Sequence, residues 1–496
     1  MSIVKQLRVD KGLDVHKDRP REDFTALVLQ NFDFDGNYIF TRKGNIKFNS
    51  SEISGTGRIL GVHVWQHPQY GRIPICARNT SGTDVNIYKA DMASKAWTSK
   101  KSYLTDDRDV YFKEYRDFLF AGNGKQPLLV SGNGDDWVYA GGSASSTPVM
   151  KVLEVYENRL FGGNESTLSF SKTNSESNFE LTNSIGIPKV RQDEITVLQR
   201  MLGALIILKE DSKWILRGWD VDSFRLSDIS LKTGCIAPRS AQMVERHLVY
   251  LNRDRELESL NGETFEVISW KIKPILEDMN PNLSKRSCSI YYKRKFWLSY
   301  VSAGSQTHDT IVVFELQPKS IKWAKYKGIN VSCFFNDGIN LWGGDASSGY
   351  VRLLDTGNDD DGVAIEQRYR RTWFDAKDPH SVKQFQELAF QFGNTGHNAT
   401  VKYMCDGRNT GGSEVLACTL PDGSYLGPTG NFTLGPTGTN NVLGPRRRVY
   451  KRLRLDPRYS TGHKFTFEIY NNTQGQHLEM FDNSLSWQHL HRRGLS

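Results

Sequence analysis

A hairpin pattern that returns about every 45 residues constrains this 496-residue chain more than any other feature. Each copy consists of a short apolar segment, a polar turn and a second apolar segment. The turns of the six clearest copies lie at Arg116, Glu157, Met201, Glu245, Lys293 and Asp337. These positions are 41, 44, 44, 48 and 44 residues apart, and a less regular copy turns near Gln69. Because a four-stranded propeller blade takes roughly 40–50 residues, the seven copies predict an all-β fold with a β-propeller of about seven blades.

The second half of each copy supports this interpretation. After the hairpin comes another strand, a polar turn and a segment that carries one aromatic residue. These aromatic residues are Trp97, Trp137, Phe179, Phe224, Phe265 and Trp323. One aromatic side chain at a fixed place in every blade is what packing between blades requires, so we favour packing over stacking platforms for sugars or bases. Helical periodicity is limited to a short segment near residues 273–279.

The repeat also predicts the domain boundaries. We assign residues 1–37 to an N-terminal arm, 38–360 to the propeller and 361–496 to a β-sandwich-like C-terminal domain. The last copy lacks an aromatic fourth strand, and a propeller that does not close leaves open sheet edges. The segment Tyr38–Phe48 reads as strand, turn and strand, so it is the candidate for closing the ring. The repeat stops at the acidic turn of residues 358–362.

A Gly/Pro-rich segment interrupts the C-terminal domain at residues 424–445. It repeats the triplet Leu-Gly-Pro, with leucine and proline at Leu426, Pro428, Leu434, Pro436, Leu443 and Pro445. Proline excludes a central strand, and a structureless loop of this length in a compact domain is usually functional or disordered. The basic run Arg446, Arg447 and Arg448 follows at once. This run is either a solvated face or a contact with DNA phosphates or an acidic partner.

Composition excludes several classes of protein. The chain has no stretch of about 18 apolar residues and no apolar region near its first residues, so we expect neither membrane insertion nor a secretory signal. The net charge of +8 is mildly basic for this size. The six cysteines form no C-x-x-C pair. We therefore expect no zinc or redox site, and we interpret the cysteines as free, mostly buried thiols.

Catalytic and metal-binding patterns are weak. Residues 359–362 (Asp-Asp-Asp-Gly) lack the ligand spacing of a calcium loop, and residues 122–125 (Gly-Asn-Gly-Lys) lack the spacing of a phosphate loop. His489 and His491 are the closest histidine pair. Residues 131–137 resemble, once only, a turn that repeats in propeller glycosidases. We predict no catalytic, cofactor-binding or metal-binding residues, no cofactor and no enzymatic activity.

Several segments, taken in order, resemble the tail nozzle proteins of short-tailed bacteriophages, also called tail tubular protein B or packaged-DNA stabilisation proteins. The resemblance covers roughly residues 30–400 and 446–485. The Leu-Gly-Pro segment departs from the family pattern. The segments that carry the resemblance are Tyr156–Gly163 (YENRLFGG) with Leu168–Ser171 and Phe179, Leu205–Gly218 (LIILKEDSKWILRG), Gly234–Ser240 with Leu248–Leu251, and Glu366–Tyr369 with Trp373 and Lys383–Phe385.

The resemblance implies a structural virion protein that is assembled in the host cytoplasm and located in the tail. It implies a homo-oligomer, a six-membered ring below the head-to-tail adaptor protein, next to tail fibre or tailspike and needle or tip proteins. Such a ring closes the channel for the packaged double-stranded DNA and releases the genome at infection. In this setting residues 424–445 are a candidate channel gate. The alternative is a propeller-based receptor-binding or glycan-degrading tail protein.

Overall fold

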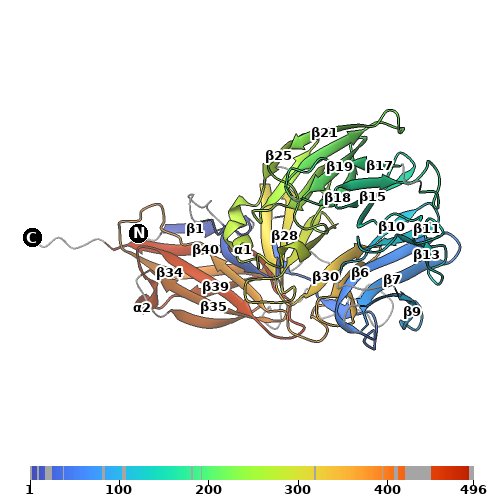
Figure 1. Cartoon of the computed structure of the whole chain (residues 1–496). Helices are drawn as coiled ribbons and strands as arrows, with labels where there is room; N and C mark the ends of the chain where they lie inside the picture. Colours follow the sequence, from blue (N-terminus) through green and yellow to red (C-terminus); the bar gives the residue numbers. More distant parts are fainter. Residues whose placement is uncertain are drawn as a thin grey trace, which may run out of the picture. The chain divides into compact units, whose positions relative to one another are not determined.

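The computed structural model describes residues 3–7, 11–16, 25–36, 38–80, 84–102, 108–179, 183–191, 193–317, 320–393, 395–406, 411–418 and 448–490. The chain forms two compact units (Figure 1). The propeller unit comprises Asn45–Phe314 and Lys327–Thr356, and the sandwich unit comprises Met1–Gly44, Glu315–Tyr326 and Gly357–Ser496. This division differs from the predicted one, because residues 1–44 are assigned to the same unit as the C-terminal segment rather than to a separate arm.

Six separate four-stranded sheets make up most of the propeller unit. Five of them are formed by four consecutive strands, in the order of the chain. Their strands are β6 (Thr56–His67), β7 (Gly71–Asn79), β8 (Val85–Ala90) and β9 (Trp97–Ser102); β10 (Tyr111–Tyr115), β11 (Phe118–Gly122), β12 (Leu129–Ser131) and β13 (Val138–Tyr139); β14 (Val152–Tyr156), β15 (Arg159–Asn164), β16 (Thr167–Phe170) and β17 (Ser184–Gly186); β18 (Ile195–Met201), β19 (Ala204–Lys209), β20 (Lys213–Arg217) and β21 (Arg225–Ser230); and β22 (Gln242–Val244), β23 (His247–Leu251), β24 (Leu257–Asn261) and β25 (Thr264–Val267).

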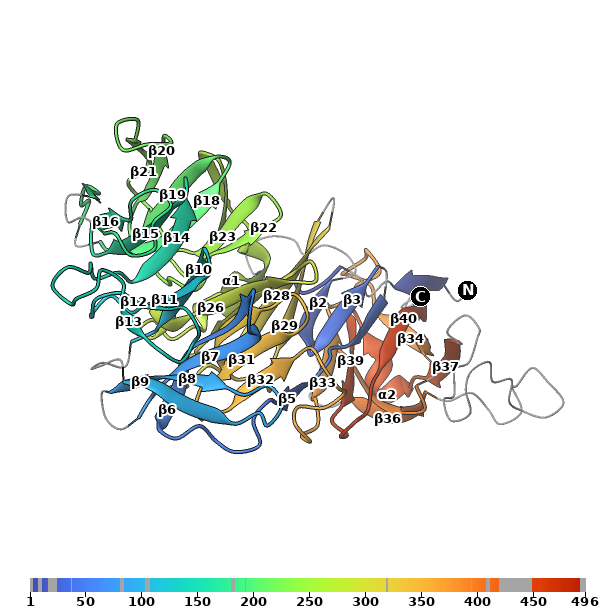
Figure 2. The ribbon, with the colours of Figure 1, turned by 90° about the vertical axis from the view of Figure 1, so that its right-hand side faces the viewer.

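The sixth sheet confirms the predicted role of an N-terminal strand. It consists of β30 (Val331–Asn336), β31 (Leu341–Asp345), β32 (Val351–Leu354) and β5 (Asn45–Lys47). Strand β5 pairs antiparallel with β32, with Lys47 opposite Arg352 (Figure 2). It therefore covers an edge that would otherwise be open. The other half of the predicted closing hairpin, β4 (Tyr38–Thr41), belongs to the sandwich unit instead.

The structure corrects the number of blades from about seven to six. The copy that turns at Lys293 does form four strands, β26 (Cys288–Tyr292), β27 (Lys295–Tyr300), β28 (Thr310–Gln317) and β29 (Ser320–Tyr326). These strands are part of a nine-stranded sheet rather than a separate blade. The reason is that β29 also pairs with β2 (Ala26–Gln30), through Gln30 and Lys325.

The predicted turns coincide with tight hairpins. Arg116, Glu157, Glu245 and Lys293 all have positive φ values, between 46° and 55°. Positive φ in a two-residue turn matches the right-handed twist of the flanking strands. In the copy at Met201 the positive φ falls one residue later, on Leu202 and Gly203. In the last copy it falls on Gly338, within the predicted Asp-Gly turn.

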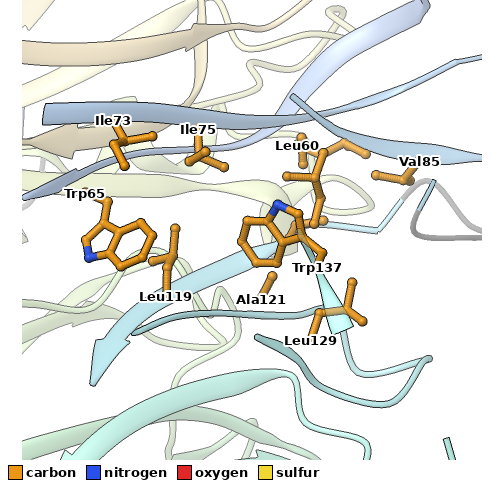
Figure 3. Packing of buried hydrophobic residues seen from close by; sticks show 12 residues of the cluster. Leu60, Trp65, Ile73, Ile75, Val85, Leu119, Ala121, Leu129 and Trp137 are labelled. Carbon is orange, nitrogen blue, oxygen red and sulfur yellow. The ribbon is translucent and has the colours of Figure 1, made fainter. Parts of the chain in front are cut away.

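Aromatic residues pack between neighbouring blades, as predicted. The rings of Trp65 and Trp137 come from the first and second blades and lie in one cluster with Leu119 and Ala121 (Figure 3). Phe179 is also buried, and so is Trp323, although β29 places Trp323 in the sandwich unit rather than in a blade. Trp97 and Phe224 are only partly buried, and Phe265 is 42% exposed, with its ring centroid 3.6 Å from the ammonium group of Lys213. Burial of large rings at blade boundaries supplies much of the apolar area that stabilises the unit.

The sandwich unit contains two β-sheet regions. The seven-stranded sheet has the order β3-β4-β40-β34-β37, with β1 on β40 and β38 on β34, and the part of the nine-stranded sheet in this unit has the order β29-β2-β33-β39-β35-β36. The remaining strands are β1 (Ile3–Leu7), β3 (Phe32–Asp35), β33 (Gln367–Arg371), β34 (Lys383–Gly393), β35 (Asn398–Cys405), β36 (Gly412–Ala417), β37 (Arg448–Arg454), β38 (Thr461–Gly462), β39 (Phe465–Asn471) and β40 (Glu479–His489).

Aromatic side chains join the two sheet regions of the sandwich unit. The rings of Phe385 and Phe465 are 4.9 Å apart, and those of Phe390 and Phe467 are 5.4 Å apart. These contacts between β34 and β39 fit the predicted sandwich-like packing. The described helices are short: η1 (Trp270–Ile272), α1 (Lys273–Glu277), η2 (Ser284–Arg286) and α2 (Pro457–Ser460). In the described part of the chain no helix has the length and apolar character needed to cross a membrane.

Candidate functional site

The structure describes one of the nine residues predicted as gate or contact positions. Leu426, Pro428, Leu434, Pro436, Leu443 and Pro445 lie outside the described residues, as do Arg446 and Arg447. Arg448 is the first residue of β37 and is exposed. The predicted contact region can therefore be examined from Arg448 onward.

Strand β37 presents a basic row on its exposed face. Its side chains alternate, so that Val449 and Leu453 are buried while Arg448, Tyr450, Arg452 and Arg454 are exposed. Alternation of this kind is the ordinary consequence of the two-residue period of a strand. Strand β37 is also the last strand of its sheet, next to β34. Arginines on an edge strand discourage pairing with other chains and provide positive charge for a partner.

Aromatic rings extend this row across the sheet. The guanidinium of Arg448 lies 4.5 Å from the ring centroid of Phe481 on β40, and Phe481 stacks on Tyr38 at 4.7 Å. Tyr450, which is 74% exposed, accepts a hydrogen bond of 2.6 Å from the side-chain amide of Gln391. We call Tyr38, Arg448, Tyr450, Arg452, Arg454 and Phe481 the aromatic–basic face.

The aromatic–basic face suits an anionic partner. The carboxylate of Glu387 lies 4.0 Å from Arg452, whose side chain is 79% exposed, and exposed pairs of this kind are held weakly. Guanidinium groups donate to phosphate or carboxylate oxygens in a planar, forked geometry, and the neighbouring rings limit their motion. The face therefore suits either a phosphate backbone or an acidic protein surface.

Residues from the first strands of several sheets line two cavities in the propeller unit. The larger has a volume of 470 Å³ and includes His63, Phe112, Glu114 and Phe335. The smaller, of 310 Å³, includes Arg58, Asp109, Lys151 and Lys285. Tyr111 and Pro238 line both cavities, so the two lie next to each other.

A cluster of charged side chains separates the two cavities. Arg239 donates to the carbonyl oxygens of Leu60 and Val110, and it lies over the ring of Tyr111 at 5.0 Å. Asp109 is 2.6 Å from Arg58 and 3.2 Å from Arg239. Burial alone would raise the pKa of Asp109, but Arg239 and Arg58 outweigh it and hold the pKa at about 2. This carboxylate is therefore ionised at every physiological pH.

His308 lies close to the same charges. Burial lowers its pKa to about 4, although a hydrogen-bond contact of 2.9 Å with the Arg286 carbonyl opposes the shift. In the larger cavity, burial lowers the pKa of His63 against the opposing effect of Glu114, 2.8 Å away. Both imidazoles are therefore neutral at pH 7.

The acidic turn after the propeller has a structural role. Asp360 is buried and forms two hydrogen bonds to Arg42, at 2.9 and 2.6 Å. The carboxylate of Asp359 accepts a hydrogen bond from the backbone N–H of Gly362. The histidine pair cannot be compared, because His491 lies outside the described residues; His489 is near Ser381 and Asp378. Among the described residues, no group of three or more His, Cys, Asp or Glu side chains is arranged to hold a metal ion.

The remaining motifs are turns whose polar side chains bond to their own backbone. Asn123 accepts hydrogen bonds from the N–H groups of Lys125 and Gln126, and Asn133 accepts from those of Asp135 and Asp136. Such bonds stabilise a turn without any ligand. All six cysteines are buried, as predicted, and none forms a disulfide; they are Cys76, Cys235, Cys288, Cys333, Cys405 and Cys418.

Sequence reasoning missed part of the site. Tyr450, Arg452 and Arg454 had a readable signal, since polar and apolar residues alternate from residue 448 to 454. The contact of Arg448 with Phe481 had no signal in the sequence, because it joins two separate strands. The cluster of Arg58, Asp109 and Arg239 likewise comes from three distant places in the sequence.

Comparisons with known proteins assign this chain to no family. No protein-family model matches the sequence, and no curated protein sequence shows significant similarity. The similar solved structures include the following three, each at low identity. BamB from Moraxella catarrhalis is 11% identical with a TM-score of 0.39, covering 71% of this chain and 97% of its own. YCF48 bound to D1 peptide is 8% identical with a TM-score of 0.40, covering 66% and 97%. PorZ of Porphyromonas gingivalis, described as a surface component of the type-IX secretion system, is 12% identical with a TM-score of 0.39, covering 64% and 38%.

Proposed function

We propose that this chain is the tail nozzle subunit of a short-tailed bacteriophage. The observation that carries the proposal is the order of the family-like segments along the folded chain. Tyr156–Gly163 covers the hairpin of β14 and β15, Leu205–Gly218 runs from β19 through β20, and Lys383–Phe385 begins β34. The resemblance thus follows successive strands of the propeller unit and continues into the sandwich unit.

In this proposal six copies form a ring in the virion tail, assembled in the host cytoplasm and bound to the head-to-tail adaptor and to tail fibre, tailspike or needle proteins. The DNA channel lies on the axis of the ring, between copies. The chain acts as a wall and a closure, without catalysis or a cofactor.

The aromatic–basic face and residues 424–447 supply the contacts that the proposal needs. Arg448 and Arg452 are exposed, and in this proposal they bind DNA phosphates or an acidic neighbour. Residues 424–445 lie outside the described residues and end two residues before β37 in the sequence; in this proposal they are the candidate channel gate. Six copies of such a segment would narrow a channel that rigid blades leave open.

Deletion of residues 424–445 tests the gate. Virions carrying the deletion should still assemble tails but lose DNA faster than wild type when salt and temperature are raised. Wild-type virions, prepared and treated in parallel, are the control. Equal DNA retention in deleted and wild-type virions would refute the gate. Antibody labelling that places the protein away from the tail would refute the nozzle.

A receptor-binding or glycan-degrading tail protein is the second candidate, and one cavity favours it. This cavity has a volume of 450 Å³ on the first two blades, and Tyr70, Arg72, Lys89 and Asp135 line it. Tyr70 is 56% exposed, and an exposed ring beside polar groups suits a sugar. Binding of host surface glycans by the pure protein, abolished by Tyr70→Ala, would support this candidate. Tight binding to virion components without glycan affinity would support the nozzle.

A further inference from the structure

The smaller cavity of the propeller unit contains an unusual concentration of positive charge. Its described lining includes five cationic residues, Arg58, Arg108, Lys151, Lys285 and Arg286. Three acidic residues face them, Asp109, Glu194 and Glu210. Among the described lining residues, cations therefore exceed anions by two (five minus three). We call this 310 Å³ space the cationic cavity.

Its innermost carboxylate is shared between two guanidinium groups. Asp109 is 2.6 Å from Arg58 and 3.2 Å from Arg239, and the side chains of both arginines are mostly buried, at 8% and 12% exposure. Burying two cations with one anion leaves positive potential in a region of reduced solvent screening. The nearby His308 does not offset this positive charge. Burial, and to a lesser extent the positive charge of Arg58, lower its pKa to about 4, so it is neutral at pH 7.

The outer lysines are held by weaker pairs. Lys151 is 3.5 Å from Glu194, whose side chain is 51% exposed, and Lys285 is 2.6 Å from Glu210 but is itself 62% exposed. Ion pairs in contact with solvent contribute little and exchange partners easily. Both ammonium groups can therefore turn toward an anion in the cavity while Arg58 stays fixed by Asp109.

We propose that the cationic cavity binds a phosphate-class oxyanion, with Arg58 at its base and Lys151 and Lys285 at its rim. A tetrahedral oxyanion accepts hydrogen bonds from several directions at once, which suits one fixed guanidinium and two movable ammonium groups. The ligand is either free phosphate or a phosphate monoester on a small molecule, since the two share this chemistry. The proposal goes beyond the nozzle function and does not depend on it.

Titration of the full-length protein with inorganic phosphate tests the site. Phosphate should raise the unfolding temperature in a saturable way, beyond the effect of sodium chloride at equal ionic strength. Glycerol 3-phosphate forms the second arm, and tighter binding of it than of phosphate would assign the monoester. If glycerol 3-phosphate binds with equal or lower affinity than inorganic phosphate, the ligand of the site is free phosphate. Isothermal titration calorimetry provides the dissociation constants for both arms.

Three variants locate the binding. Lys151→Gln leaves the Arg58–Asp109 pair intact and should weaken phosphate binding by about tenfold, the value of one charge-assisted hydrogen bond. Arg58→Gln should abolish binding, but it also disturbs a buried pair, so Lys151→Gln is the decisive variant. Lys100→Gln is the control, because Lys100 pairs with Asp135 at a different cavity. The proposal is overturned if phosphate acts no more strongly than chloride, or if Lys151→Gln and Lys100→Gln bind phosphate equally well.

Discussion

Arg42 and Asp360 are 318 residues apart in the sequence and form a two-pronged ion pair inside the sandwich unit. Their side chains are 1% and 7% exposed. Arg42 also donates to Asn31, and its guanidinium lies 5.7 Å from the ring of Tyr326. The pair therefore ties the three chain segments of the sandwich unit together at the place where the N-terminal segment leads into the propeller.

Removing the carboxylate of this pair should destabilise the protein strongly. Asp360→Ala deletes the anion that balances the buried guanidinium of Arg42, a change that typically costs about 3–5 kcal/mol in free energy of unfolding. Asp359→Asn is the matched control, because an amide oxygen can still accept the N–H of Gly362; it should cost less than about 0.5 kcal/mol. Chemical denaturation of the full chain measures both. Similar decreases in stability for the two variants would contradict the structural role of the pair.

The aromatic–basic face should make DNA binding sensitive to salt. If Arg448 and Arg452 bind phosphates, the double substitution Arg448→Gln and Arg452→Gln should lower affinity for duplex DNA and reduce the salt slope by about 0.9 for each phosphate that is no longer neutralised. Arg458→Gln is the control, since Arg458 is equally exposed in the same unit but pairs with Asp456. Fluorescence anisotropy between low and moderate salt measures the slopes. An unchanged slope in the double variant would leave an acidic protein as the partner of this face.

Local sequence signals predicted the features that depend on neighbouring residues. Hairpin turns are formed by adjacent residues, so the period of the pattern located Arg116, Glu157, Glu245 and Lys293 at turns. The last copy of the repeat lacked a fourth strand, so the sequence predicted that an N-terminal strand closes the sheet. Strand β5 takes this place by pairing with β32. The basic strand from Arg448 was visible as a run of charge.

Features that depend on distant pairing were not predictable from one sequence. Nothing near Lys293 indicates that β29 also pairs with β2, because that pairing joins residues 30 and 325. The same holds for β1, which lies in the predicted N-terminal arm but pairs with β40. The sequence did not predict that Asp109 pairs with both Arg58 and Arg239, because the two arginines come from distant copies of the repeat.

Gly162 should tolerate no side chain, because β15 approaches another chain segment closely. A Cβ atom at Gly162 would overlap the sulfur of Met150, which is fully buried. Gly162→Ala should therefore cost about 1–3 kcal/mol through overpacking. Gly186→Ala is the control in the same blade, since a Cβ there meets nothing within 4 Å. Equal unfolding temperatures for the two variants would show that Met150 moves aside without cost.

Stability should fall with pH in the window set by His308. Burial lowers its pKa in the folded protein to about 4, whereas an unfolded histidine titrates near 6.5. Between these values the unfolded state binds more protons, so the contribution is complete above pH 6.5 and is lost as the pH falls toward 4. From pH 7 to pH 4.5 this single group should lower the free energy of unfolding by about 2 kcal/mol. The variant His308→Gln keeps a donor for the Arg286 carbonyl but does not titrate. Between pH 7 and pH 4.5 its free energy of unfolding should therefore fall by about 2 kcal/mol less than that of the wild type. Denaturant midpoints at pH 7, 6, 5 and 4.5 give the comparison, and parallel curves for the variant and the wild type would mean that His308 is protonated in the folded state.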